Sequence, residues 1–283
     1  KTHLLFLMRD GYLPQRVFDA LDTGLDSKAV EISRFTASAA SFTSEAAVVE
    51  HLEVELESTD LAAIAKQLLF TAGETEAILR KLPAQSRSAA FAKAVRKPAN
   101  LRKILARSQS FAERLVGYVA KEVAPAPGDT LMLVDLGYNG TVQDKVEPLL
   151  RRALDVEVVG RYLLLREQKM GRFDKKGLID GRHYASTTLE ALCTNVAVIE
   201  QLCTAAQGSV VDYDASGCAV RAGSSIKAQQ STVREHVQHG CIRYAVERDA
   251  AFVRAPLSDT DDTRRQAAAA VLARLMFLPL PHE

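Results

Sequence analysis

Two widely separated segments of the chain follow the same order of residue types. "LLFLMRDGY" and "LMLVDLGYNG" each run from an apolar strand pattern through an Asp to a Gly beside a Tyr, and an amphipathic stretch follows each. Apolar strands that alternate with helices are typical of a parallel sheet covered on both faces. Ligands of such sheets bind beyond the carboxyl ends of the strands. We therefore expect Asp10 and Asp135, near the ends of these strands, to lie at one edge of a common sheet.

Hydrophobic periodicity predicts an α/β fold with a Rossmann-like, mostly parallel sheet, a large helical insertion and a helical C-terminal part. Residues 44–122 have helical spacing throughout and are expected to form about four helices inserted into a single domain of residues 1–283. The remaining predicted elements are strands over 4–8, 29–32 and 130–135, one strand or a strand pair over 156–167, helices over 13–21, 188–204, 231–253 and 263–277, and a hairpin over 208–222.

Composition narrows the class of protein. The 283 residues include 36 Lys and Arg against 35 Asp and Glu, so no overall basic charge favours nucleic acid. No apolar run approaches the ~18 residues of a membrane span. The four cysteines form no C-x-x-C pair and are expected to be structural thiols, two of them in apolar surroundings as small core residues, which fits a reducing cytoplasm. We expect a cytoplasmic protein without an integral membrane segment, and peripheral contact with the inner membrane stays open.

Cationic side chains and a glycine-containing loop also fall at the predicted strand ends. Arg9 and Arg34 could clamp phosphate oxygens in a bidentate way. Gly137, Gly140 and Thr141 would let backbone N–H groups approach an anion at a helix N-terminus. The Gly-x-x-Gly-Thr loop lacks the Lys of a Walker loop, and no G-x-G-x-x-G occurs, so the pattern favours a phosphate over a dinucleotide.

A purely structural interpretation competes with this one. A strand-end Asp often caps the next helix, and a Gly there often only makes the turn. Glu200 also allows a functional and a structural interpretation. It falls on a mostly apolar helical face, where a Glu without a partner is uncommon. An ordinary exposed helical Glu is equally compatible with the spacing. The turn at Gly208 and Ser209 could bring further N–H groups near Glu200.

Four motifs together resemble a known family that often accompanies a phosphatase of the haloacid-dehalogenase type in bacterial polysaccharide biosynthesis. They are "FLMRDGY" at 6–12, "EISR" at 31–34, "VDLGYNGTVQ" at 134–143 and "IEQLCTAAQGS" at 199–209. Their order and spacing match over most of the chain. One departure is Ala206-Gln207, where the family has Pro-His, and this removes a His-dependent role there.

The resemblance implies a glycan phosphoribosyltransferase. Such an enzyme moves ribose 5-phosphate from phosphoribosyl pyrophosphate (PRPP) to a polysaccharide acceptor, such as an O-antigen or capsule, with inversion to a β-ribofuranoside. A phosphatase domain or chain then removes the 5-phosphate. Inversion needs a base for the acceptor hydroxyl, and Asp10 or Asp135 is the expected base, the other contacting a ribose hydroxyl or Mg²⁺. The sequence names no metal ligands, but Mg²⁺ commonly accompanies pyrophosphate donors.

The predicted site therefore has two groups of residues. Its catalytic candidates are Asp10, Asp135 and Glu200, and its substrate-binding candidates are Arg9, Gly11, Tyr12, Ser33, Arg34, Gly137, Tyr138, Asn139, Gly140, Thr141, Gln143, Gly208 and Ser209. Two alternatives stay open: a phosphohydrolase of the haloacid-dehalogenase type with Asp10 as nucleophile, and a non-catalytic scaffold that binds a sugar phosphate. The phosphohydrolase would require a second Asp at position 12, where this chain has Tyr12.

Overall fold

A five-stranded parallel sheet forms the centre of the protein. The structure is a computed structural model that describes residues 1–57, 60–166, 172–223, 231–251 and 261–280. The strands are β1 (Thr2–Leu7), β2 (Ser27–Val30), β3 (Thr130–Tyr138), β4 (Glu157–Leu165) and β5 (Lys175–Asp180), in the order β2-β1-β3-β4-β5. Every neighbouring pair is parallel, which confirms the predicted α/β fold class.

The strand order reverses direction between β1 and β3. The chain leaves β1 toward β2 on one side, returns to β3 on the other side of β1, and continues outward to β4 and β5. Phe6 of β1 is in register with Val134 of β3, so both strands end at the same edge of the sheet. Crevices at such reversal points are the usual ligand sites of open α/β sheets. The topology therefore places the two similar segments where a ligand site is expected.

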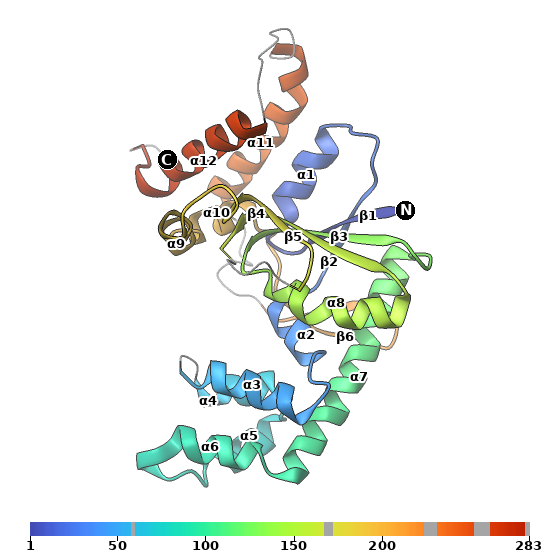
Figure 1. Cartoon of the computed structure of the whole chain (residues 1–283), viewed down its shortest axis with the longest axis vertical. Coiled ribbons are helices and arrows are strands. Elements are labelled where there is room, and N and C mark those ends of the chain that lie inside the picture. Colours follow the sequence, from blue (N-terminus) through green and yellow to red (C-terminus); the bar gives the residue numbers. More distant parts are fainter. Residues whose placement is uncertain (58–59, 167–171, 224–230, 252–260, 281–283) are drawn as a thin grey trace.

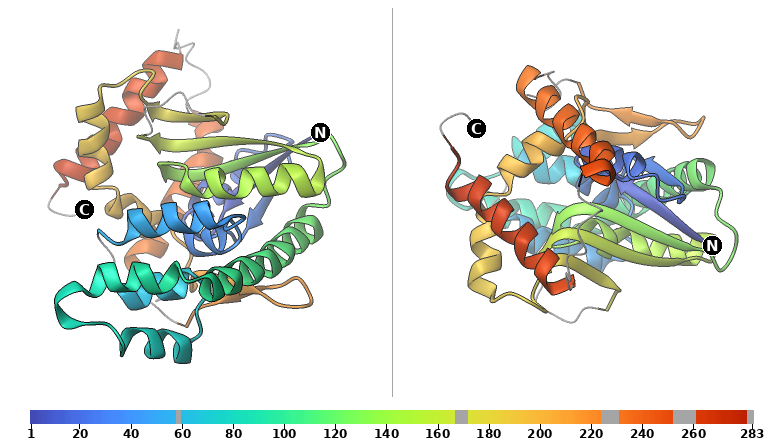
Figure 2. Two further views of the ribbon diagram at one scale, coloured as in Figure 1. Left: turned by 60° about the horizontal axis from the view of Figure 1, so that its bottom comes forward. Right: turned by 90° about the horizontal axis from the view of Figure 1, so that it is seen from above.

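One face of the sheet is covered by helices that lie below it in Figure 1. These helices are α2 (Arg34–Ala39), α7 (Pro98–Val123) and α8 (Thr141–Leu154). The hairpin of β6 (Val210–Tyr213) and β7 (Ala219–Arg221) runs beside α7, as Figure 2 (left) shows. Leu5 and Leu133 of the sheet, Leu115 of α7 and Val146 of α8 are buried together in this layer. The predicted hairpin is thus confirmed, and it belongs to the core.

The second face is covered by helices that are distant in the sequence. They are α1 (Tyr12–Ala20), α9 (Ser186–Thr194), α10 (Ala197–Cys203), α11 (Thr232–Ala251) and α12 (Asp261–Phe277). Leu13, Leu164, Ile179 and Leu189 form their common core with the sheet, and α11 and α12 lie above it in Figure 1. Cys193 and Cys203 are buried in this core and Cys241 packs against it, as expected for structural thiols, whereas Cys218 is exposed. Each described helix is too short or too polar to serve as a membrane span.

The helical insertion has a core of its own. In the described residues it contains α3 (Glu45–Glu55), α4 (Leu61–Gln67), α5 (Ala72–Leu79), a 3₁₀ turn η1 (Ala84–Ser86), α6 (Arg87–Val95) and α7, which is one α-helix more than the sequence predicts. Leu52, Ile64, Phe91 and Ile104 are fully buried among these helices. The 26-residue α7 joins the two cores, because its first half closes the insertion and its second half packs on the sheet. A continuous helix thus fixes the insertion to the sheet.

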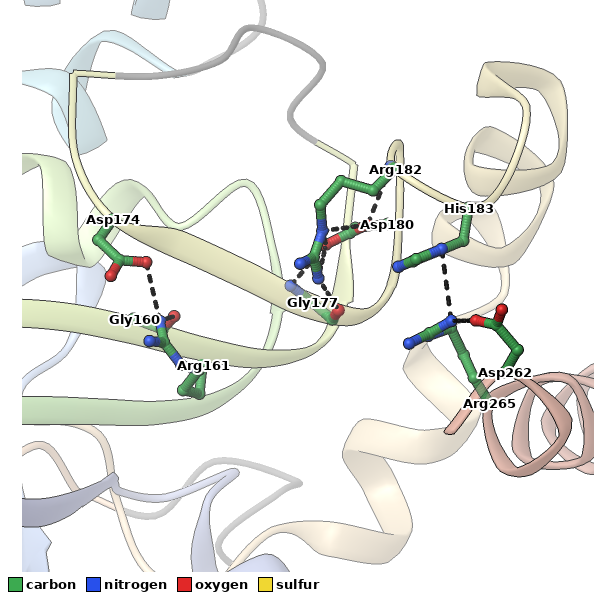
Figure 3. A network of polar contacts seen from close by, with 9 residues as sticks. All are labelled: Gly160, Arg161, Asp174, Gly177, Asp180, Arg182, His183, Asp262 and Arg265. Carbon is green, nitrogen blue, oxygen red and sulfur yellow. Dashed lines mark hydrogen bonds and ion pairs between the residues drawn. The ribbon is translucent and has the colours of Figure 1, made fainter. Parts of the chain in front are cut away.

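Strand β5 was not predicted from the sequence. It is held in the sheet by polar contacts as well as by its pairing with β4. The carboxylate of Asp180 accepts hydrogen bonds from Gly177 N at 2.8 Å and from Arg182 Nε at 2.8 Å. Arg182 also donates to Gly177 O at 2.9 Å, and Arg161 of β4 pairs with Asp174 at 3.0 Å (Figure 3). These contacts compensate for a short edge strand that begins with two lysines.

Candidate functional site

A polar cavity of about 290 Å³ opens at the carboxyl ends of β1 and β3. It is close to the small end of pockets that hold small molecules, which span about 300–1,000 Å³. Most of the predicted site residues line it, namely Arg9, Asp10, Ser33, Arg34, Asp135, Gly137, Tyr138, Asn139, Gly140, Thr141, Glu200, Gly208 and Ser209. The fold thus brings together four motifs that are far apart in the sequence.

Asp10 does not cap the following helix. The N-cap of α1 is Gly11, which provides no side-chain hydrogen bond, and Gly11 N donates instead to Leu7 O at 2.8 Å. The Oδ1 atom of Asp10 is buried and accepts no hydrogen bond from the described residues, with Arg9 Nε 4.0 Å away. An unsatisfied buried carboxylate oxygen is destabilising in the free protein. It therefore favours a ligand role for Asp10 over the capping role.

Asp135 lies among other negative charges. It is half-buried, and its Oδ1 accepts a hydrogen bond from Leu136 N at 2.8 Å. Burial and repulsion from Asp10 and Glu200 raise the pKa of Asp135 to about 7, against an ordinary 3.8, although Arg34 opposes the shift. A carboxyl group with this pKa exchanges its proton near neutral pH, which suits a general base. The N-cap of α8 is Gly140, so Asp135 does not cap that helix either.

Glu200 is held in the cavity by Tyr138. The hydroxyl of Tyr138 donates to Glu200 Oε1 at 2.6 Å, a bond between β3 and α10. Burial and the neighbouring carboxylate raise the pKa of Tyr138, so the phenol keeps its proton and remains a donor. Glu200 is therefore an oriented carboxylate, not the exposed helical Glu that its spacing also allowed.

Arg9 and Arg34 differ in whether their guanidinium groups already contact other residues of the protein. Arg9 has a side chain that is only 16% exposed, and its guanidinium contacts Asp10 and Gln207 O. Ala205 N donates to Arg9 O at 3.0 Å, so Arg9 also anchors the 205–207 segment. Arg34 is exposed at the first position of α2 and makes no hydrogen bond or ion pair with the described residues. Arg34 is therefore the guanidinium better placed to receive an anion.

Ser33 positions Arg34 and has no free hydrogen-bond donor. Its hydroxyl accepts from Thr36 N at 3.1 Å as the N-cap of α2 and donates to Val210 O at 2.9 Å. The Thr36 hydroxyl accepts from Ser33 N at 2.9 Å, which completes a capping box. Ser33 thus ties the end of β2 to β6.

The loop between β3 and α8 presents an uncapped helix N-terminus to the cavity. Gly140 supplies no side-chain cap, and the first bond of α8 runs from Asp144 N to Gly140 O. The preceding N–H groups at 141–143 therefore lie in the first helical turn, where backbone donors have no partner within the helix. Arg166 N donates to Tyr138 O at 2.7 Å and fixes the loop. An anion would find both N–H donors and the positive end of the helix dipole here.

The 207–209 segment closes the cavity from the side of the hairpin. A Cβ on Gly208 would lie 2.0 Å from Ala222 O, so only glycine allows the backbones to approach, and Ala222 N donates to Ser209 O at 2.9 Å. The sequence prediction missed Gln207 and Glu31, which also line the cavity. Their positions next to Gly208 and to the Ser33 turn were the signals that could have identified them.

Three predicted residues lie outside the cavity lining. Gly11 makes the turn into α1, and Tyr12 is the first residue of that helix. Gln143 is a fully buried residue of α8, and its Nε2 donates to Glu147 Oε2 at 2.8 Å and to Asp174 O at 3.2 Å. Its Oε1 accepts from the Tyr162 hydroxyl at 2.8 Å. The structure therefore assigns Gln143 to the packing of α8 on β4.

Gln143→Ala is expected to destabilise the fold by roughly 2–4 kcal/mol and to leave ligand affinity unchanged. The change removes the side-chain amide that bonds the Tyr162 hydroxyl and Oε2 of buried Glu147, whose pKa burial already raises. Urea denaturation and ligand titration of the same preparation would check both parts. A weakened affinity at full stability would return Gln143 to the binding site.

The cavity combines four carboxylates, one guanidinium without a hydrogen bond or ion pair to the described residues, and a helix N-terminus. One of the carboxylates, Glu31, is already paired with Arg221. The carboxylates Asp10, Asp135 and Glu200 provide candidates for proton transfer and hydroxyl recognition, and Arg34 and the first turn of α8 provide charge for an anion. This combination suits a phosphorylated, hydroxyl-rich molecule. In comparisons with known proteins, no family model and no curated protein matches the chain.

Proposed function

We propose that the chain is a glycan phosphoribosyltransferase that transfers ribose 5-phosphate from PRPP to a saccharide hydroxyl. One observation carries the proposal: four motifs that resemble that family line a single cavity at the β1/β3 reversal point. The cavity offers positive groups for the donor's phosphates and carboxylates for its hydroxyls and for the acceptor.

The donor is held through its two anionic ends. Arg34 and the N–H groups at the start of α8 lie on the cavity wall and bind phosphate oxygens. Glu200, oriented by Tyr138, accepts a hydrogen bond from a ribose hydroxyl. When the 5-phosphate and the pyrophosphate of the donor are both bound, the anomeric carbon between them is held in a fixed orientation toward the acceptor. This orientation of the reacting groups contributes to the rate.

Asp135 acts as the general base. The acceptor hydroxyl attacks the anomeric carbon from the face opposite to the pyrophosphate, its proton passes to Asp135, and the C–O bond to pyrophosphate breaks. The α-configured donor becomes a β-ribofuranoside, and the released pyrophosphate takes the bonding electrons. A pKa of about 7 makes Asp135 a stronger base than an ordinary carboxylate while it stays largely ionised at slightly alkaline pH.

Asp10 is the residue that would contact Mg²⁺ if the donor brings one. Among the described residues, no group of three or more His, Cys, Asp or Glu side chains could hold a metal by itself. Mg²⁺ at pyrophosphate sites keeps waters and phosphate oxygens and needs only one or two carboxylates. The buried, unsatisfied Oδ1 of Asp10 fits that role. Bound Mg²⁺ would neutralise the charge of the leaving pyrophosphate.

The product would carry a 5-phosphate that this reaction does not remove. A phosphatase, in another domain or another chain, is therefore the partner that the proposal implies. The haloacid-dehalogenase type named by the resemblance fits this step.

Arg34→Gln is expected to weaken PRPP binding by about tenfold or more without changing the melting temperature. Arg34 makes no hydrogen bond or ion pair with the described residues, so its removal breaks no such contact of the fold. Calorimetric titration with PRPP, with and without Mg²⁺, measures the loss. Arg102→Gln is the matched control, because Arg102 is exposed on α7 away from the cavity.

The wild-type titration decides the proposal itself. Failure of the folded wild type to bind PRPP would overturn it. Binding without pyrophosphate release in the presence of saccharide acceptors would instead leave a sugar-phosphate-binding protein.

A further inference from the structure

A second cavity of about 800 Å³ lies between the helical insertion and α8. We call it the insertion groove, and the residues that define it are Ser38, Ser41, His51, Gln67, Lys145 and Arg152. The lining residues of one wall come from α2, α3 and the end of α4, and those of the other wall come from α8. Figure 1 locates these helices in the fold. The insertion therefore creates a hollow that the sheet and its covering helices alone do not form.

The insertion groove is continuous with the donor cavity. Arg34, Phe35 and Thr141 line both. Thr141 begins α8, and Arg34 begins α2, so the uncapped first turn of α8 and Arg34 both line the junction. A molecule bound in the groove could thus extend one end through the junction toward Asp135.

The basic side chains of the groove have fewer hydrogen-bond and ion-pair partners than its acidic side chains. Lys145 and Arg152 form no hydrogen bond or ion pair with the described residues. By contrast, Asp144 pairs with Lys175 at 2.6 Å, and Glu55 accepts from Gln67 Nε2 at 3.4 Å. Exposed Glu50 is the remaining acidic residue of the lining. With Arg34 at the junction, the uncommitted cations favour a ligand with negative charge.

Neutral hydrogen-bonding groups line the rest of the groove. Buried His51 bonds through Nε2 to Gln67 Oε1 at 3.0 Å. Burial and the nearby charge of Lys145 lower the pKa of His51, so the ring is neutral at neutral pH. Ser38, Ser41 and Thr43 line the same hollow. Imidazole, amide and hydroxyl groups in one groove match the hydroxyl groups of a sugar.

From the continuity, the charge and the polar lining, we infer that the insertion groove binds the acceptor as an anionic saccharide, one that carries a carboxylate or a phosphate. Lys145 and Arg152 pair with the negative group, and the hydroxyl to be modified reaches the junction at Arg34. This inference rests on the proposed function for the nature of the reacting hydroxyl. It adds a location and a charge class for the acceptor.

The test compares three defined disaccharides in the presence of PRPP: cellobiose, cellobiouronic acid and cellobiose 6′-phosphate. Saturation-transfer NMR titration of the wild type is expected to show binding of the two charged sugars at least about tenfold tighter than cellobiose, with the preference reduced at high salt. The carboxylate and phosphate arms show which anionic group is preferred.

The double variant Lys145→Gln/Arg152→Gln is expected to lose this preference while its PRPP affinity and melting temperature stay at wild-type values. Lys93→Gln/Arg102→Gln is the matched control, because both of its residues are exposed on the insertion and outside the groove. Equal affinity of wild type for charged and neutral sugars, or an unchanged preference in the groove variant, would overturn the inference. Absent PRPP binding would overturn the proposed function and leave the charge preference as a separate result.

Discussion

Asp135→Asn is expected to unfold at a higher temperature than the wild type at alkaline pH. The folded protein holds the pKa of Asp135 near 7, whereas the unfolded chain has the ordinary value of 3.8. The native state therefore binds more protons between these values, and stability falls as the pH rises through them. Asparagine carries no charge and keeps an oxygen for Leu136 N. The expected gain is roughly 2–4 kcal/mol at about pH 8 and close to zero below about pH 4.

The sign of this effect distinguishes Asp135 from an ordinary surface carboxylate. Asp214 is the matched control, because its hydrogen bonds from Ser216 and Cys218 lower its pKa. Asp214→Asn should bring no gain at alkaline pH. Urea denaturation of both variants and the wild type at acid and alkaline pH measures the difference. A gain for Asp135→Asn that is independent of pH would contradict the electrostatic explanation.

The same Asp135→Asn change tests the assignment of the base. Loss of a general base typically slows a reaction by about 10²–10⁴-fold. In the wild type, kcat/KM should increase about tenfold per pH unit below the pKa and level off above it, which for Asp135 means near pH 7. Pyrophosphate release, followed over this pH range, checks both points. A stabilised variant with a wild-type rate and pH profile would remove Asp135 from the mechanism.

The strands of the sheet could be predicted from the sequence where burial requires a run of apolar residues. β1, β3 and β4 are apolar runs because helices cover both faces of the sheet and leave most of their residues buried or half-buried, a pattern typical of a parallel sheet. β5 was not predictable, since "KKGLID" is a short edge strand with Leu178 exposed. Arg182, two residues beyond its end, bonds back to Asp180 and Gly177, and hydrophobic periodicity does not reveal such a polar contact. The six-residue α2 has no periodicity to detect and owes its start to the Ser33 capping box.

The candidate site was predictable as a set of motifs but not in the roles of its members. Strand ends converge for topological reasons, so Asp10 and Asp135 could be placed together before the fold was known. Spacing alone cannot say which way a polar side chain on α8 points, and Gln143 turns out to face β4. It also cannot show that Arg9 is committed to Gln207 while Arg34 is free, because those partners lie far along the chain.

Gly137→Ala is expected to destabilise the protein severely and to disrupt both the sheet edge and the donor cavity. Gly137 has φ +124°, which side-chain-bearing residues rarely adopt, and an added Cβ would lie 1.8 Å from Leu164 O. Gly137 is in register with Leu164, so relief of this overlap requires β3 and β4 to separate where the cavity loop begins. The expected loss is roughly 3–5 kcal/mol, measured as a shift of the urea midpoint.

Gly117→Ala provides the opposite result on the same scaffold. Gly117 lies within α7, and a Cβ there would meet no atom within 4 Å. Alanine is the better helix former, so this variant is expected to gain about 0.5–1 kcal/mol. The two variants add the same methyl group, so a difference in sign isolates the backbone geometry of the β3–α8 loop as the cause. Comparable stability of the two variants would show that this loop tolerates a side chain and that Gly137 is not required to form the site.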